Sequence, residues 1–324
     1  MTEIFATVGP STLNKKFLTA INKRKVNLLR INLSHTKIKD LESTVNFIKR
    51  YTKIPVCFDT EGAQIRTTSI FKNKMILKTN TSVFIHKNKQ SKKSFSLTPI
   101  EAFDLINEGD ILSIDFDSVQ IKIIEKKNLS LKATVINGGS IAINKGVSVN
   151  RQIKLASFTK KDIQAFKIAK DLKIKNIALS FASTGQDVKR LREIFKYPIN
   201  IISKIESKRG LKNLKNIISE SNGILIDRGD LSREVPLENI PQTQKNIINV
   251  AKKMKKSVYV ATNLLESMVI KKDPTRAEVN DIYNTLIDGA NGLVLAAETA
   301  IGNYPLECIN MISKVAKVYK KNHK

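Results

Sequence analysis

The sequence alternates short β-branched runs with longer amphipathic segments, and this alternation limits the fold more than any other feature. Eight runs have the composition of strands, and a helical pattern follows each one. Parallel strands need crossover connections, so the pattern predicts an α/β fold in which eight units close into a (β/α)₈ (TIM) barrel. The expected strands are 4–9, 26–34, 54–60, 176–181, 200–206, 223–231, 257–263 and 292–298.

One interval breaks the alternation. Between residues 68 and 150 the pattern is of short strands and turns, such as SVFIH and VQIKII, with one short helical pattern near 99–106. We therefore expect a β-rich domain over 68–150, inserted after the third strand. The barrel domain would then consist of residues 1–67 and 151–324.

The composition limits the class of protein. The hydrophobic fraction of 41% and the charged fraction of 26% are typical of a soluble globular protein. No run approaches the roughly 18 apolar residues that a membrane span needs, and the N-terminus lacks the pattern of a secretory signal. We expect a cytoplasmic protein that does not bind membranes. Cys57 and Cys308 are too few for a disulfide framework, so we interpret both as buried thiols.

The net charge of +27 raises the question of nucleic acid binding. The excess is mostly lysine spread along the whole chain, without a basic arm, zinc-ligand spacing or interleaved aromatic residues. We therefore expect a solvated lysine surface and no specific nucleic-acid partner. Specific binding would instead appear as an interaction that collapses with salt and ignores Mg²⁺. A basic surface would also concentrate anionic substrates.

Polar side chains gather at the C-terminal ends of the expected strands. In a barrel these ends meet on one face, where barrel enzymes carry their chemistry. Polar groups are costly to bury without partners, so the strand ends predict a functional site. The residues are Arg30, Asn32, Ser34, His35, Asp59, Thr60, Ser180, Lys204, Glu206, Arg228, Gly229, Asp230, Thr262 and Glu298.

Several of these residues have two interpretations each. Glu206 and Asp230 are suited to holding Mg²⁺, but Glu206 could instead pair with Lys204 while Asp230 caps a turn. Lys204 could stabilise charge on a transferring phosphoryl group or form a structural salt bridge. Arg30 and Arg66 could clamp phosphate oxygens or form surface ion pairs. The residues alone leave these alternatives open.

The chain contains no P-loop, dinucleotide-binding glycine pattern or protein-kinase motif set. A nucleotide would therefore be held by another device. His35 could contact it, although a lone histidine after a strand also commonly forms hydrogen bonds within its loop.

Taken in order, seven segments resemble the motifs of the pyruvate kinase family, and the similarity runs over essentially the whole chain. The segments are RINLSH (30–35), DTEGAQIRT (59–67), ISKIE (202–206), RGDLSREVP (228–236), ATNLLESM (261–268), PTRAEVND (274–281) and AAETAIGNYPLE (296–307). The resemblance implies transfer of phosphate from phosphoenolpyruvate to ADP, giving pyruvate and ATP in glycolysis. It also implies a homo-oligomer that uses Mg²⁺ or Mn²⁺, and K⁺ as a further cation.

The resemblance assigns roles by position. It makes Lys204, Arg30 and Thr262 catalytic, and it makes Arg30, Lys204, Gly229, Asp230 and Thr262 the contacts of phosphoenolpyruvate or pyruvate. Nucleotide contacts would be Asn32, His35, Arg66, Lys145 and Pro10. The divalent cation would bind Glu206 and Asp230, and the monovalent cation would bind Asn32, Ser34, Asp59 and Thr60. The inserted β domain would be the family's mobile lid.

The chain departs from the family pattern at several positions. Glu61, Ala63 and Gln64 replace the usual residues of DTKGPEIRT, which leaves K⁺ dependence open, and Asp227 stands where a small residue is common. Asn263, Ala296 and Ala297 also differ. These changes keep open a paralogue acting on a different phosphorylated or 2-oxo acid, and a catalytically silent barrel with a binding or regulatory role. The chain ends where the family's C-terminal regulatory domain would begin, so we expect a short form without it.

Overall fold

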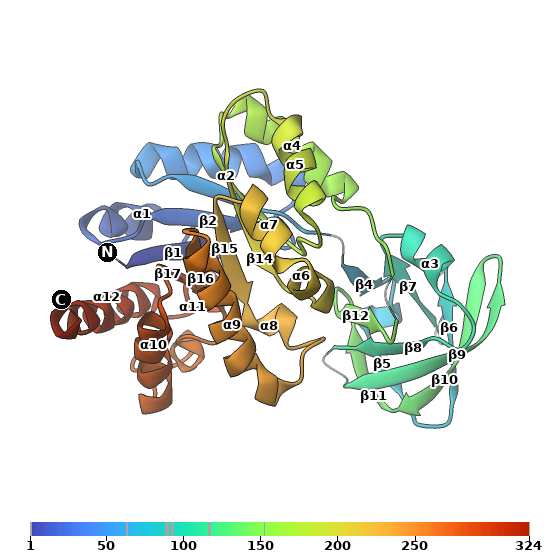
Figure 1. Ribbon diagram of the computed structural model, residues 1–324. Coiled ribbons are helices and arrows are strands. Elements are labelled where there is room, and N and C mark those ends of the chain that lie inside the picture. Colours follow the sequence, from blue (N-terminus) through green and yellow to red (C-terminus); the bar gives the residue numbers. More distant parts are fainter. Residues whose placement is uncertain are drawn as a thin grey trace. The chain divides into compact units, whose positions relative to one another are not determined.

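The computed structural model describes residues 2–62, 64–87, 91, 94–115, 118–151 and 153–323. The chain divides into two compact units (Figure 1). One comprises Met1–Gly62 and Lys160–Lys324, and the other comprises Ala63–Thr159. The sequence predicts a shorter insertion, with limits at 67/68 and 150/151 in place of 62/63 and 159/160. These predicted domain limits stay a prediction. Ala63, one of the departures noted above, lies outside the described residues.

The first unit is built on a closed barrel of parallel strands, which confirms the predicted (β/α)₈ fold. Each strand pairs with the next along the chain, and the last pairs with the first through Glu3↔Gly292 and Ile4↔Leu293. The strands are β1 (Glu3–Val8), β2 (Leu28–Asn32), β3 (Val56–Asp59), β13 (Asn176–Leu179), β14 (Asn200–Ile205), β15 (Gly223–Asp227), β16 (Ser257–Ala261) and β17 (Gly292–Leu295).

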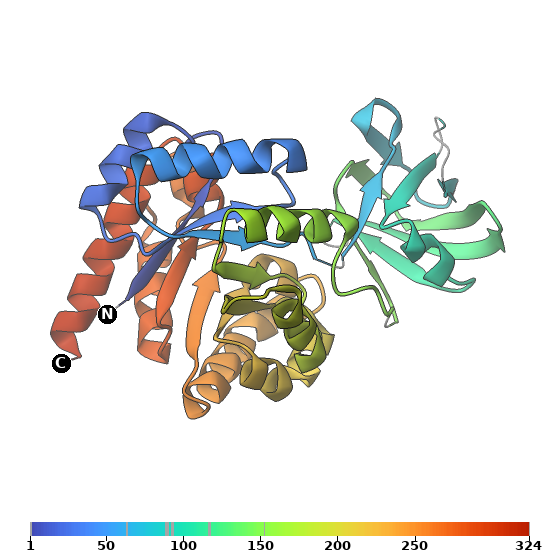
Figure 2. The same ribbon diagram turned by 90° about the horizontal axis from the view of Figure 1, so that it is seen from above.

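Helices follow the strands and cover the outside of the barrel (Figure 2). In both views α2 lies beside α4, and the last helix, α12, lies beside the N-terminal strand β1. The helices are α1 (Lys15–Ala20), α2 (Ile38–Tyr51), α4 (Lys160–Asp171), α5 (Gly185–Ile194), α6 (Lys208–Lys212), α7 (Leu214–Glu220), α9 (Ile240–Lys253), α10 (Arg276–Asp288) and α12 (Pro305–Asn322). Short 3₁₀ turns are η1 (Ile21–Lys23), η3 (Leu237–Asn239) and η4 (Glu266–Val269). No helix of the described ranges is long and apolar enough to cross a membrane.

Two of the expected strands extend too far. The strand expected over 223–231 ends at Asp227, and the chain then forms the short helix α8 (Arg228–Leu231). The strand expected over 292–298 ends at Leu295 and is followed by α11 (Ala297–Ala300). In both places the polar residues mark the point where the chain turns away from the barrel wall, because ladder pairing has stopped there.

The interior of the barrel explains why polar residues gather at one end. One apolar cluster takes a side chain from every strand: Phe5, Leu28, Cys57, Ala178, Ile202, Leu225, Tyr259, Ala261 and Val294. Side chains on a strand alternate between its two faces, so the next inward position lies two residues further along. On six strands that position is Thr7, Arg30, Asp59, Ser180, Lys204 or Asp227. We call these six residues the mouth layer.

The second unit has its own closed barrel, with the strand order β10-β6-β7-β4-β12-β8-β9. These strands are β4 (Ile65–Thr68), β6 (Ser82–His86), β7 (Ser94–Thr98), β8 (Ile111–Ile114), β9 (Val119–Lys127), β10 (Ser130–Asn137) and β12 (Gly146–Val149). A separate ribbon pairs β5 (Lys74–Leu77) with β11 (Gly139–Ala142), and the short elements are η2 (Phe71–Asn73) and α3 (Glu101–Leu105). The unit has a separate apolar core. These elements confirm a small β domain inserted after the third barrel strand.

Candidate functional site

The mouth layer lies at the C-terminal ends of the barrel strands and contains four buried charged side chains. Arg30, Asp59, Lys204 and Asp227 are each at most 5% exposed. Charged groups are rarely buried to this extent unless they are paired or bind an ion. The partners of each group therefore decide what the layer can do.

Arg30 is held in place by two neighbouring strands. Its Nε donates to Asp59 Oδ2 at 2.5 Å, and its Nη1 donates to Thr7 Oγ1 at 3.0 Å. Burial opposes the charge of the guanidinium, but Asp59 and Asp227 outweigh it and raise the pKa of Arg30. The alternative of a surface ion pair is wrong for this residue, because Arg30 is 5% exposed. It is a fixed cation at the barrel mouth.

Lys204 lies at the centre of the charged group. Its Nζ is 2.8 Å from Glu206 Oε1, 3.4 Å from Asp59 Oδ1 and 3.4 Å from Asp227 Oδ2. It also donates to Ser180 Oγ at 3.2 Å. Burial opposes its charge, but the three carboxylates raise the pKa of Lys204. Lys204 is therefore a permanently charged donor, and the predicted pairing with Glu206 is present.

Glu206, Asp227 and Asp230 form a carboxylate cluster, in which one oxygen of each lies within 4.8 Å of the other two. Glu206 Oε2 accepts a hydrogen bond from the Phe181 amide at 2.6 Å, whereas its buried Oε1 accepts none. Oε1 does lie 2.8 Å from Lys204 Nζ, but as an ion pair without hydrogen-bond geometry. Burial raises the pKa of Glu206 to about 8, with Asp230 and Asp227 adding to the effect and Lys204 opposing it.

The cluster fits a divalent cation. Its donors are hard carboxylate oxygens, which Mg²⁺ and Mn²⁺ prefer. A cation would also give the buried Oε1 of Glu206 a ligand bond and offset the repulsion that raises the pKa of that group.

Gly229 and Thr262 follow the neighbouring strands β15 and β16, and hydrogen bonds hold the two strand ends together. The Gly229 amide donates to Thr262 Oγ1 at 2.8 Å, and Arg228 Nη2 donates to the Thr262 carbonyl at 2.6 Å. Arg228 is itself paired with Asp281 at 2.8 Å. Thr262 and Asn263 both have left-handed backbone, with φ of 70° and 54°. Such conformations are costly outside glycine and concentrate at functional sites.

The four residues expected to bind a monovalent cation follow the neighbouring strands β2 and β3, where Asn32 pairs in register with Asp59. Asn32 Oδ1 accepts a hydrogen bond from the Ser34 amide at 2.9 Å, and Thr60 Oγ1 accepts one from the Ser180 amide at 2.8 Å. Since these oxygens already accept hydrogen bonds within the chain, K⁺ binding stays a prediction.

The expected nucleotide contacts fall into two groups. Asn32, His35 and Pro10 belong to the barrel unit, where Pro10 and His35 are exposed. Arg66 and Lys145 belong to the inserted unit, where Arg66 Nη1 donates to the Asn144 carbonyl and Lys145 pairs with Asp115 at 2.8 Å. The two groups belong to different units, and their role in nucleotide binding stays a prediction.

One expected member of the site has a different position. Glu298 is 2% exposed, and its carboxylate accepts hydrogen bonds from the amides of Leu265 at 3.2 Å and Ala296 at 2.7 Å. It supports the loops after β16 and β17 and does not belong to the carboxylate cluster.

Sequence reasoning missed Thr7 as a site residue. The signal was the alternation in β1, where Phe5 faces the apolar cluster and Thr7 is the next inward position. Thr7 accepts the hydrogen bond from Arg30 and thereby fixes the guanidinium.

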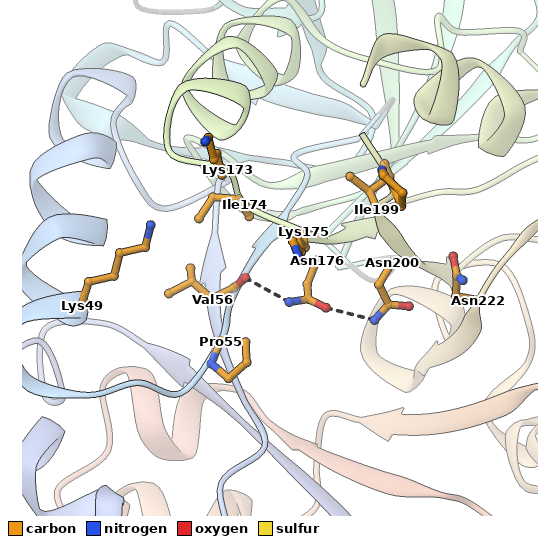
Figure 3. Close-up of a pocket in the computed structure, with 11 residues that line it drawn as sticks. Lys49, Pro55, Val56, Lys173, Ile174, Lys175, Asn176, Ile199, Asn200 and Asn222 are labelled. Carbon is orange, nitrogen blue, oxygen red and sulfur yellow. Dashed lines mark hydrogen bonds between the residues drawn. The ribbon is translucent and has the colours of Figure 1, made fainter. Parts of the chain in front are cut away.

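A cavity of about 510 Å³ lies at the other end of the same barrel (Figure 3). It includes the first residues of β3, β13 and β14, where Asn176 donates to the Val56 carbonyl and Asn200 donates to Asn176 Oδ1. Barrel enzymes carry their chemistry at the opposite, C-terminal ends of the strands. The mouth layer, and not this cavity, is therefore the candidate active site.

Comparisons with known proteins identify the family of the chain. A family model described as "Pyruvate kinase, barrel domain" matches residues 1–309. Similar proteins include the pyruvate kinase of Methanocaldococcus jannaschii, which is 37% identical over 99% of this chain and 70% of its own length. The pyruvate kinase of Thermotoga maritima is 36% identical over 99% of this chain and 71% of its own length. Plastidial pyruvate kinase 2 of Arabidopsis thaliana is 32% identical over 97% of this chain and 56% of its own length.

Proposed function

The chain belongs to the pyruvate kinase family and has that family's function, and we propose that its mouth layer transfers the phosphoryl group of phosphoenolpyruvate to ADP. The observation that carries this proposal is the buried Lys204, which keeps its charge among three carboxylates at the C-terminal end of the barrel. A fixed cation in a site shielded from water stabilises negative charge that develops during a reaction.

Lys204 acts on the transferring group. Its ammonium is a point charge with three N–H donors. In the free protein this group contacts Ser180 and the neighbouring carboxylates. When an anionic substrate enters, the ammonium can exchange a carboxylate contact for a phosphoryl or enolate oxygen without losing its charge. This exchange stabilises the transition state more than the free substrate, as catalysis requires.

Arg30 and Thr262 orient the substrate. Arg30 is fixed by Asp59 and Thr7, so its fork of donors is already oriented for an anion. Thr262 follows the end of β16 and is held by Gly229 and Arg228, which follow the neighbouring strand β15. Fixed donors of this kind reduce the entropy that is lost when the reacting groups are aligned.

Glu206 and Asp230 hold the divalent cation, for which we propose Mg²⁺ or Mn²⁺. The bound cation neutralises phosphoryl charge and aligns donor with acceptor. The backbone amide of Phe181 orients Glu206 by holding its other oxygen. The remaining assignments complete the proposal: K⁺ at Asn32, Ser34, Asp59 and Thr60, nucleotide contacts by Asn32, His35, Pro10, Arg66 and Lys145, and a homo-oligomer in the cytoplasm.

A second candidate is a family member acting on a different phosphorylated or 2-oxo acid. Asp227 favours it, because this carboxylate adds negative charge beside the groups that would bind an anionic substrate. A panel of phosphorylated and 2-oxo acids, each supplied with ADP or ATP, separates the two candidates.

A coupled assay of pyruvate formation from phosphoenolpyruvate and ADP tests the proposal. We expect turnover with Mg²⁺ or Mn²⁺ and none after chelation, and a comparison with and without K⁺ tests the monovalent site. Folded protein that binds Mg²⁺ but forms no pyruvate in any of these buffers would contradict the proposal and favour the second candidate.

A further inference from the structure

Asp227 is a member of the mouth layer whose position is dictated by the barrel. It is the last residue of β15 and lies two residues beyond Leu225, which faces the apolar interior. Alternation along the strand therefore directs its side chain inward, and the residue is 4% exposed. Its carboxylate lies 3.4 Å from Lys204 and within 4.8 Å of oxygens of Glu206 and Asp230.

Asp227 differs from its acidic neighbours in how its charge is balanced. Three ion pairs give the other carboxylates a cation each: Asp59 with Arg30 at 2.5 Å, Glu206 with Lys204 at 2.8 Å, and Asp230 with Arg233 at 3.2 Å. Asp227 shares its cations with other carboxylates: it lies 3.4 Å from Lys204, which pairs more closely with Glu206, and it also interacts with Arg30, which pairs with Asp59. In these ion pairs of the described barrel mouth, four carboxylates share three cations, so the group that includes Asp227 has one carboxylate in excess.

A buried carboxylate in excess is balanced by a proton or by a further cation, because burial in a medium of low dielectric constant strongly disfavours an unbalanced charge. The Oε1 atom of Glu206 gives an independent indication of the same need. It is buried in the same cluster, meets no donor in hydrogen-bond geometry, and pairs at 2.8 Å with Lys204, which Asp59 and Asp227 share. Both observations fit one cation held between the three carboxylates.

We propose that Asp227 is a third carboxylate ligand of the divalent cation, beside Glu206 and Asp230. This inference rests on the proposed function, because it concerns the cation that the reaction uses. It adds Asp227 to the cation site, and it links binding of the cation to binding of the anionic substrate. With no cation bound, Asp227 repels an anionic substrate; with the cation bound, its charge is used in coordination.

Two properties follow. First, the cation binds before the anionic substrate and strengthens its binding, because the cation removes the repulsion from Asp227. Second, the site favours Mn²⁺ over Mg²⁺, since Mg²⁺ is usually held by one or two carboxylates with several water molecules, and Mn²⁺ is bound more tightly by sites of oxygen donors. A purely structural counter-ion of Lys204 would have neither property.

Direct titration with Mn²⁺, in the absence of any substrate, tests the inference. Free Mn²⁺ is measured by electron paramagnetic resonance with the wild-type chain, Asp227→Asn and Asp227→Ser. The asparagine keeps the shape of the side chain and removes its charge. We expect each variant to bind Mn²⁺ at least about tenfold more weakly, which is the size of effect expected from one charge at contact distance in a buried site.

Asp288→Asn is the matched control. Asp288 ends α10 and pairs with Lys245 at 3.5 Å, away from the carboxylate cluster, so its loss leaves Mn²⁺ binding unchanged. Circular dichroism of each variant in chelator checks that it is folded. Wild-type Mn²⁺ affinity in folded Asp227→Asn or Asp227→Ser would overturn the inference.

The titration separates this inference from the proposed function, because it requires no turnover. Weakened Mn²⁺ binding together with a wild-type chain that forms no pyruvate would leave the inference standing and refute the function. Pyruvate formation with unchanged Mn²⁺ binding would do the reverse. In assays over a range of Mn²⁺ concentrations, Asp227→Asn should also reduce the extent to which Mn²⁺ lowers the KM for phosphoenolpyruvate, whereas loss of a structural counter-ion would not affect this coupling.

Discussion

Removing the charge of Lys204 should destabilise the free protein as well as stop the reaction. In Lys204→Met the three carboxylates that contact the ammonium at 2.8, 3.4 and 3.4 Å lose their shared cation. At an effective dielectric constant of about 20, the contact at 2.8 Å corresponds to ~6 kcal/mol and each contact at 3.4 Å to ~5 kcal/mol. The desolvation of Lys204 offsets most of this sum.

Measurements on buried pairs set the expected size. Removing one partner of a buried ion pair typically costs about 3–5 kcal/mol, because the other charge stays buried without compensation. We expect the free energy of unfolding of Lys204→Met to fall by that amount in chelator, and divalent cations to restore part of it by taking over the balancing role. Denaturant unfolding followed by circular dichroism, with chelator and with Mg²⁺, measures both effects.

The deficit should depend on pH with a defined sign. Burial raises the pKa of Glu206 to about 8 even though Lys204 opposes the shift, so loss of Lys204 raises that pKa further. A carboxyl whose folded pKa is raised loses its contribution to stability as the pH rises. Below about pH 8 Glu206 is protonated in both folded proteins and their stabilities fall together, so the difference between variant and wild type should grow as the pH rises above about 8.

A matched variant isolates the effect of burial. Lys245→Met removes a lysine whose side chain is 55% exposed and which pairs with Asp288 at 3.5 Å. Exposed pairs contribute about 0–1 kcal/mol, so this variant should unfold close to wild type. If Lys204→Met unfolded like Lys245→Met at every pH, the assignment of Lys204 as the balancing cation of the cluster would be refuted.

Four further predictions concern the barrel unit. Arg30→Lys should lose most activity and about 1–3 kcal/mol of stability, measured by the coupled assay and by denaturant unfolding, because an ammonium cannot reproduce the fork that binds Asp59 and Thr7. Thr275→Ala should cost about 1 kcal/mol in the same unfolding experiment, since it removes the N-cap of α10. Although burial opposes the shift, hydrogen bonds from Ser267 and Thr275 lower the pKa of Glu278. The contribution of Glu278 to stability is therefore present above its unfolded pKa and is lost as the pH falls through its folded pKa. Glu278→Gln should remove that part of the dependence of stability on acid pH. Leu225→Ala should cost about 2–5 kcal/mol, because Leu225 is 1% exposed in the barrel interior.

Much of the fold could be predicted because two periodicities are explicit in the sequence. The β-branched runs and the amphipathic segments between them specify which segments become strands and helices, and the break after the third strand specifies the insertion. The ends of the strands were less predictable. The sequence predicted that the strand continues through RGDL (228–231). These residues instead form α8, because strand pairing ends at Asp227 and Ala261.

The sequence predicted which residues belong to the site better than it predicted which of them contact one another. The positions of Lys204, Glu206 and Asp230 followed from polar residues at strand ends, whereas the sharing of Lys204 among Asp59, Glu206 and Asp227 depends on contacts across strands that are distant in sequence. Which oxygen of a carboxylate meets which donor is set by barrel closure, and no local pattern encodes it. Asp227 could have been found by alternation alone, since Leu225 and Asp227 share one face of β15.

The backbone of Thr262 marks a different limit of sequence reasoning. Its left-handed conformation would be expected of glycine, and no residue type in ATNLL indicates it. The conformation follows from hydrogen bonds that Arg228 and Gly229 supply from the neighbouring strand end. Strain of this kind is imposed by the assembled site and becomes visible with the structure.

The most direct measurement is the rate of pyruvate formation from phosphoenolpyruvate and ADP by wild type and Lys204→Met, side by side at saturating Mn²⁺. If Lys204 stabilises the transferring group, wild type turns over and the variant loses at least about 10²–10³-fold in kcat, the cost of removing one such donor. A folded Lys204→Met with wild-type kcat would contradict the role of Lys204 on which the proposed mechanism depends.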